Sequence, residues 1–141
     1  MKVRRSKKVM ENFVCPSCWN QIQSCTCQNY PPYHLVMIDV NIQDAIRILN
    51  QKGYQTIGCC ESHFGDSCSI YVAFPFDQGF SNIPDGFSYT KQKTIVSYAF
   101  NKNERENEEL YKIVKEEKLK TLHEWVESLP DNPKCFRRQS G

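Results

Sequence analysis

Four of the eight cysteines in this 141-residue chain fall between positions 15 and 27, as two short pairs. Cys15 and Cys18 enclose a Pro-Ser dipeptide, a spacing that folds into a tight turn and directs both sulfur atoms at one ion. Cys25 and Cys27 form the second pair a few residues later. Such a compact set predicts a tetrahedral, structural zinc site with no open coordination position. The alternative is a group of unconnected buried or surface thiols.

The rest of the chain has the composition of an ordinary soluble domain. It is 40% hydrophobic and 24% charged, and at this length a single core folds without a metal or disulfide staple. We see no apolar run near the roughly 20 residues that span a bilayer, and no signal-peptide pattern at the N-terminus. We therefore expect a cytoplasmic protein, in which clustered cysteines bind metal rather than form disulfides.

The charge is uneven along the chain. Residues 1–30 hold five basic residues against the single acidic residue Glu11. A basic arm ahead of a metal module is compatible with binding to nucleic-acid phosphates, and the alternative is a solvated, unordered terminus. The residues of the arm that we expect to contact nucleic acid are Arg4, Arg5, Lys7 and Lys8.

Composition shifts divide the chain into four parts. We expect a flexible basic arm (1–12), a zinc knuckle with a proline-rich linker (13–33), an α+β domain (34–130) and a C-terminal tail (131–141). The linker is assigned because consecutive prolines exclude helix and favour extended geometry.

Apolar periodicity predicts the elements of the main domain. The run 34–40 indicates a buried strand. Asn41 is a candidate N-cap of a helix that ends at Gly53 and buries one apolar face. That face is made by Ile42, Ala45, Ile46 and Leu49.

Further strands are predicted over 54–58 and 69–74, followed by a hairpin of 87–90 and 94–100. The segment 104–129 predicts a long amphipathic helix. Its apolar face is expected to hold Leu110, Ile113, Val114, Leu122, Trp125, Val126 and Leu129. This order of elements indicates an α+β fold, a mainly antiparallel sheet with two helices packed on one face, plus the N-terminal zinc knuckle.

The loop that follows the 54–58 strand gathers metal-ligating and titratable residues. Adjacent cysteines on a strand point to opposite faces, so we expect Cys59 to face the core and Cys60 to serve the loop. Three functions compete: a ligand site, a second metal site through Cys60, His63 and Cys68, and a cysteine nucleophile activated by His63. The alternative is a plain surface loop. The candidate ligand-binding residues are Cys60, Glu61, Ser62 and His63.

The segments 49–56, 59–63, 71–74 and 83–87 resemble a group of small uncharacterised proteins encoded by phages and prophages of Gram-positive bacteria. These proteins often begin with a cysteine module and a Tyr-Pro-Pro-Tyr-type linker, as this chain does. The resemblance covers roughly residues 15–100 and implies no established activity. More remotely, Thr56, Cys60 and His63 are placed as in the wybutosine-synthesising tRNA methyltransferase family, which implies S-adenosylmethionine as a cofactor.

Together these features favour a zinc-stabilised, non-enzymatic binding protein of a phage or mobile element. Its expected partner is a host protein or a nucleic acid, and inhibition of a host nuclease or defence complex is one form of that role. It would act in the host cytoplasm. The alternatives are an S-adenosylmethionine-dependent RNA-modifying enzyme and a structural or assembly protein.

Overall fold

A computed structural model describes residues 11–27, 36–66 and 68–132 of the chain. It shows an α+β fold, as the sequence predicts, with a two-stranded sheet and a four-stranded antiparallel sheet of order β3-β4-β6-β5. The elements are β1 (Phe13–Val14), η1 (Ile22–Ser24), β2 (Val36–Met37), η3 (Val40–Ile42), α2 (Gln43–Gln51), β3 (Gly58–Cys60), β4 (Ile70–Ala73), β5 (Ser88–Tyr89), β6 (Ile95–Tyr98), α3 (Lys102–Glu106) and α4 (Glu108–Ser128).

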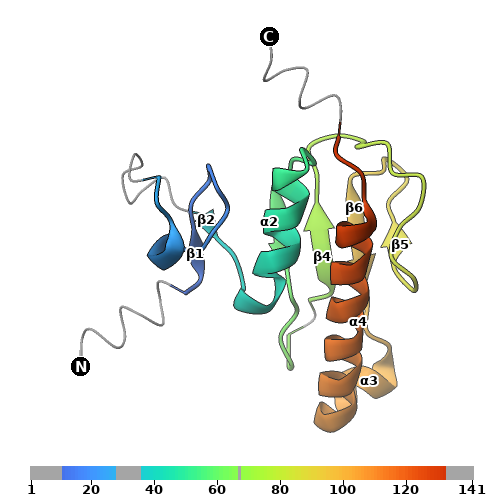
Figure 1. The fold of residues 1–141 in the computed structure, drawn as a ribbon. Helices are drawn as coiled ribbons and strands as arrows, with labels where there is room; N and C mark the ends of the chain where they lie inside the picture. Colours follow the sequence, from blue (N-terminus) through green and yellow to red (C-terminus); the bar gives the residue numbers. More distant parts are fainter. Residues whose placement is uncertain (1–10, 28–35, 67, 133–141) are drawn as a thin grey trace, which may run out of the picture.

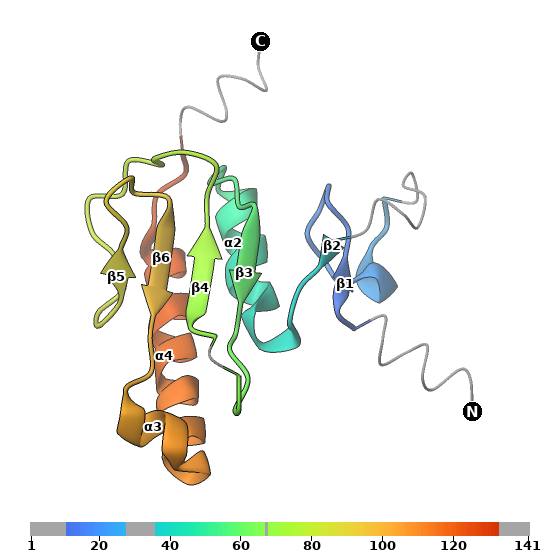
Figure 2. The ribbon, with the colours of Figure 1, turned by 180° about the vertical axis from the view of Figure 1, so that it is seen from behind.

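The two longer helices cover the same face of the four-stranded sheet. Figure 1 shows α2 and α4 in front of the strands, and Figure 2 shows the strands in front of the helices. The predicted apolar face of α2 is buried, and β4 and β6 contribute fully buried residues opposite it. Since apolar side chains alternate along these strands, one face of the sheet forms the core with the helices. The shared core residues include Ile42, Ile46, Leu49, Ile70, Val72, Val96, Leu122 and Val126.

The predicted long C-terminal helix is two helices that meet at Asn107. Asn107 caps α4 because its side chain accepts a hydrogen bond from the Leu110 backbone N–H at 3.2 Å. The first turns of α4 lie beside α3 rather than over the sheet (Figure 1), so their apolar face differs from the prediction. Leu110 and Ile113 are 37% and 63% exposed, whereas Tyr111 is buried. Leu122, Trp125 and Val126 are buried as predicted.

Of the strand predicted over 34–40, the described part lies outside the main sheet. It is β2, which pairs antiparallel with β1, so that Val36 is opposite Val14. Asn41 does not cap α2, whose N-cap is Ile42 and has no side-chain cap bond. The reason is that both the backbone N–H and the side-chain amide of Asn41 donate to the Glu61 carboxylate, each at 2.9 Å.

Residues at both ends of the described part are hydrogen-bonded to the body of the protein. Asn12 accepts a backbone hydrogen bond from Ile38 at 2.6 Å. At the other end, Asn132 is buried and donates to the backbone carbonyls of Lys52 and Gly53 at 2.7 and 3.2 Å. Most of the predicted arm and tail (1–10, 133–141) and the proline-rich linker (within 28–35) lie outside the described residues. Within the described part, no helix is long and apolar enough to cross a bilayer.

Candidate metal centres

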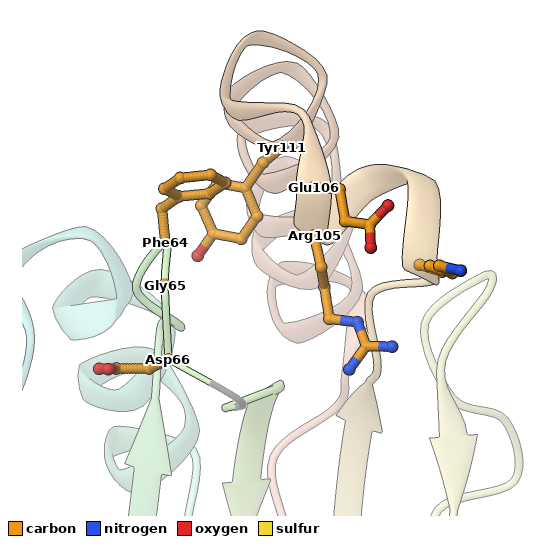
Figure 3. Close-up of a pocket in the computed structure, with 7 residues that line it drawn as sticks. Phe64, Gly65, Asp66, Arg105, Glu106 and Tyr111 are labelled. Carbon is orange, nitrogen blue, oxygen red and sulfur yellow. The ribbon is translucent and has the colours of Figure 1, made fainter.

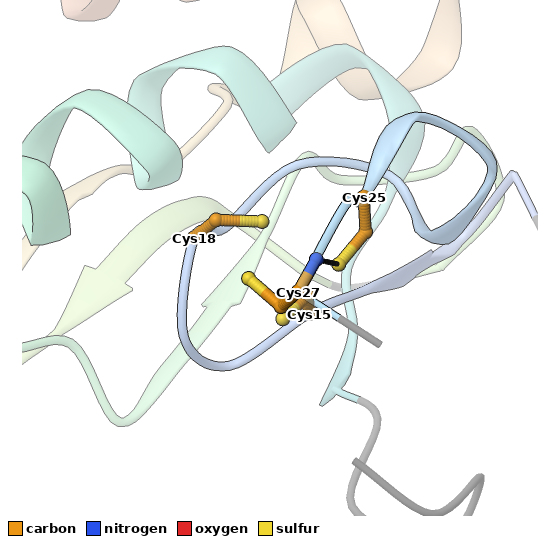
Figure 4. A group of neighbouring side chains, drawn as sticks. All are labelled: Cys15, Cys18, Cys25 and Cys27. Atoms are coloured by element: carbon orange, nitrogen blue, oxygen red, sulfur yellow. Dashed lines mark hydrogen bonds between the residues drawn. The ribbon is translucent and has the colours of Figure 1, made fainter. Parts of the chain in front are cut away.

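The four clustered cysteines meet in space as the sequence predicts. The sulfur atoms of Cys15, Cys18, Cys25 and Cys27 all lie within 4.8 Å of one another (Figure 4). None of the four is in a disulfide, and Cys15 is buried while the other three are half-buried. Zinc–sulfur bonds of about 2.3 Å place tetrahedral sulfurs about 3.8 Å apart, so these thiols could hold a metal ion after small adjustments.

Tight turns bring each pair of sulfur atoms together. After Cys18 the chain reverses through Trp19, which has a φ of 63°. Its backbone N–H donates to the Cys15 carbonyl at 2.8 Å. Within each pair a backbone N–H also points at sulfur: Ser17 donates to Cys15 Sγ at 3.4 Å, and Cys27 donates to Cys25 Sγ at 3.3 Å (Figure 4). Such donors stabilise the thiolate form and orient it, as outer-shell hydrogen bonds do at metal sites.

The protonation of the thiols is also suited to a cation. Burial raises the pKa of Cys18, but hydrogen bonds from the Asn20 backbone and side chain, and then from Cys25 and Cys15, lower it to about 7. Hydrogen bonds to Cys18 and Cys25 raise the pKa of Cys27 to about 12. The cluster therefore shares its protons unequally, with one thiolate stabilised by its neighbours. A divalent cation that displaces these protons would bind all four thiolates at once and offset half of their combined negative charge.

The cysteine module is attached to the body of the protein. Gln21 donates to the Gln43 side chain at 2.9 Å, and Gln51 donates to the Cys18 carbonyl at 3.0 Å. Val14 belongs to the main core, and Trp19 packs against it. The module therefore rests directly on α2, and a metal ion bound there would stabilise this contact.

The central loop separates its two adjacent cysteines as predicted. Cys59 packs against the core, and burial, followed by the negative charges of Asp39, Cys60 and Glu61, raises its pKa to about 12. Cys60 instead lies with Asp39 and His63, whose ligand atoms are all within 4.8 Å of one another. Burial also raises the pKa of Cys60, which disfavours the predicted nucleophile.

The other two predicted ligand-binding residues of this loop are buried. Glu61 forms an ion pair with Lys115 at 2.8 Å. The hydroxyl of Ser62 donates to the Cys68 carbonyl at 2.8 Å and lies 2.7 Å from the Tyr111 hydroxyl. These two residues hold the loop in place and do not present ligand atoms to solvent. Sequence reasoning missed Asp39, whose only signal was a charged residue within an apolar run.

A hollow of about 350 Å³ lies next to this loop, lined by the loop and by the start of the C-terminal helices. The rings of Phe64 and Tyr111 meet edge-on, with their centroids 5.3 Å apart. Arg105 extends from α3, and the Asp66 side chain points away from the hollow (Figure 3). Both signs of charge line the hollow, so it has no clear preference for an anionic ligand. Its lining residues are Phe64, Gly65, Asp66, Lys102, Arg105, Glu106 and Tyr111.

Residues that the remote resemblance would assign to a cofactor site have other contacts. The Thr56 hydroxyl accepts a hydrogen bond from Asn50 at 2.9 Å, and the Thr56 backbone N–H donates to the same side chain at 3.2 Å.

The predicted nucleic-acid-binding residues Arg4, Arg5, Lys7 and Lys8 lie outside the described residues. No protein-family model, no curated protein and no solved structure matches this chain.

Proposed function

We propose that this protein is a small, non-enzymatic binding protein whose N-terminal module is stabilised by one structural zinc ion. The observation that carries this proposal is the convergence of four thiols, two of which accept backbone N–H donors, on a module seated against α2. Thiolate ligands in a tetrahedral set select zinc among the common divalent ions. Four protein ligands leave no position for a substrate, so the ion serves the fold.

Two kinds of partner are supported, by different features. The basic residues immediately before β1 support a nucleic acid, because neutralised phosphates release counterions and favour binding. The resemblance to small phage proteins supports a host protein, such as a nuclease or a defence complex. In either case the zinc module and the adjoining arm form the docking region.

The metal assignment is tested by counting zinc ions in full-length protein purified without chelator. Cys27→Ser should contain one zinc ion fewer per chain than wild type, because the tetrahedral set loses a ligand. Cys68→Ser is the matched control, since Cys68 is an exposed thiol outside the cluster. Equal zinc contents in the wild type and in Cys27→Ser would refute the structural zinc site.

The choice of partner is tested by fluorescence anisotropy with short RNA and DNA at several salt concentrations. Binding should weaken steeply with salt, with a log–log slope of about −0.9 for each phosphate contacted in B-DNA. Deleting residues 1–9 removes every basic residue ahead of Glu11 and should flatten this slope. If neither nucleic acid binds at low salt, the nucleic-acid partner is refuted. A pull-down from host lysate that compares wild type with Cys27→Ser then tests for a host protein that requires the zinc module.

A further inference from the structure

We propose that Asp39, Cys60 and His63 bind a second divalent ion of the zinc class, with one coordination position left open. Their ligand atoms lie within 4.8 Å of one another, although the residues come from two separate segments of the chain. Asp39 precedes η3, whereas Cys60 ends β3 and His63 lies in the loop after it. A thiolate, an imidazole and a carboxylate are each donor types that zinc binds in proteins, and three protein ligands are typical of zinc sites with an open position.

The sulfur of Cys60 has the same local geometry as the sulfurs of the N-terminal cluster. The backbone N–H of Ser62 donates to Cys60 Sγ at 3.2 Å, two residues along the chain. Cys15 and Cys25 each accept the same bond from the residue two positions later, at 3.4 and 3.3 Å. The chain therefore builds the thiolate-stabilising turn a third time, at a cysteine remote in sequence from the first cluster.

The other two ligands are oriented before any ion binds. The Asp39 carboxylate accepts the Glu61 backbone N–H at 3.2 Å, and the same oxygen lies 3.3 Å from His63 Nε2. Ser62, which lies between Cys60 and His63 in the sequence, is fully buried and has a φ of 73°. This left-handed conformation turns the chain after Cys60. An ion in this site would replace the contact between Asp39 and His63 with two bonds to metal and would preserve the arrangement of the loop.

The fourth coordination position of the ion is left open because two of the three ligand side chains are partly exposed to solvent. The side chains of His63 and Asp39 are 51% and 33% exposed, so the site faces solvent. Cys68 lies near Cys60 but is not part of the group of mutually close ligand atoms. Three protein ligands with solvent access leave the fourth position to water or to a donor atom from a bound molecule. This site differs in kind from the closed four-cysteine cluster and does not depend on the function proposed above.

The test is to count zinc ions per chain by native mass spectrometry on full-length protein equilibrated with Zn²⁺ under reducing conditions. Wild type should hold two ions, and His63→Ala should hold one. His123→Ala is the matched control, because His123 is also partly exposed and also contacts a carboxylate, that of Glu127 at 3.3 Å. This control should hold two ions. Thermal melting in excess chelator should be the same for His63→Ala and wild type, which separates a lost ligand from a lost fold.

Two further variants separate this proposal from the first. Cys27→Ser should lose the N-terminal ion alone and keep the second, while the double variant with His63→Ala should lose both. A wild-type protein with a single ion that Cys27→Ser removes would overturn the second site and leave the first intact. Two ions in His63→Ala would also overturn it. Loss of the second ion in Cys68→Ser would make Cys68 a ligand and overturn the open position.

Discussion

Replacing Lys115 by methionine should lower the free energy of unfolding by about 3 kcal/mol at neutral pH. Lys115 donates to the Glu61 carboxylate at 2.8 Å and to the Ser62 carbonyl at 2.7 Å, and the Glu61 side chain is only 7% exposed. Breaking a buried ion pair from one side costs about 3–5 kcal/mol, because it leaves an uncompensated charge. We expect the lower end of this range because Asn41 still donates two hydrogen bonds to Glu61.

The loss should also depend on pH. Burial raises the pKa of Glu61, but hydrogen bonds from Lys115 and Asn41 outweigh burial and hold it below its ordinary value. In wild type this carboxylate therefore stabilises the fold above the unfolded-state pKa, and the contribution disappears as pH falls through the lower, folded-state pKa. Without Lys115 the folded-state pKa rises, and protonation of Glu61 relieves the buried charge. The difference between variant and wild type should then shrink in acid.

Urea denaturation at neutral and acidic pH measures both effects. Lys112→Met is the matched control, because Lys112 pairs with Glu108 at 3.7 Å through side chains that are 71% and 59% exposed. It should change the unfolding free energy by less than about 0.5 kcal/mol. The double variant Glu61→Gln/Lys115→Met should be more stable than Lys115→Met alone, since the unpaired charge is gone. A loss below about 1 kcal/mol in Lys115→Met, or one that is equal at both pH values, would refute this reasoning.

Two other hydrogen-bonded positions give further predictions. Ser62→Ala should lower the unfolding free energy by about 2 kcal/mol, because the Tyr111 hydroxyl and the Cys68 carbonyl lose a buried partner. Thermal melting measures this loss, and an unchanged melting midpoint would contradict it. Lys52→Met should cost about 2 kcal/mol, because its ammonium donates to three backbone carbonyls at the C-terminal end of α4. Hydrogen exchange should then accelerate in the last turn of α4, and unchanged protection there would count against this role.

The sequence determined the features that depend on neighbours along the chain. The apolar spacing of Ile42, Ile46 and Leu49 was sufficient to predict α2 and its buried face. The two turn-linked cysteine pairs were sufficient to predict that their sulfurs converge. The predicted hairpin is also present, as the antiparallel pair β5 and β6. Each of these depends on local geometry, in which spacing alone determines which side chains share a face or a turn.

Only the tertiary structure decided the features that depend on segments far apart in sequence. Asn41 donates to Glu61 instead of capping α2, and Asp39 reaches Cys60 and His63, because the start of α2 lies against the end of β3. Tyr111 is buried because Ser62 and Phe100 meet it there, although helical spacing favoured its neighbours. A local pattern states which side chains can be buried together. Tertiary packing determines which of these side chains are buried. It also determines which donors bond to acceptors that are distant in sequence.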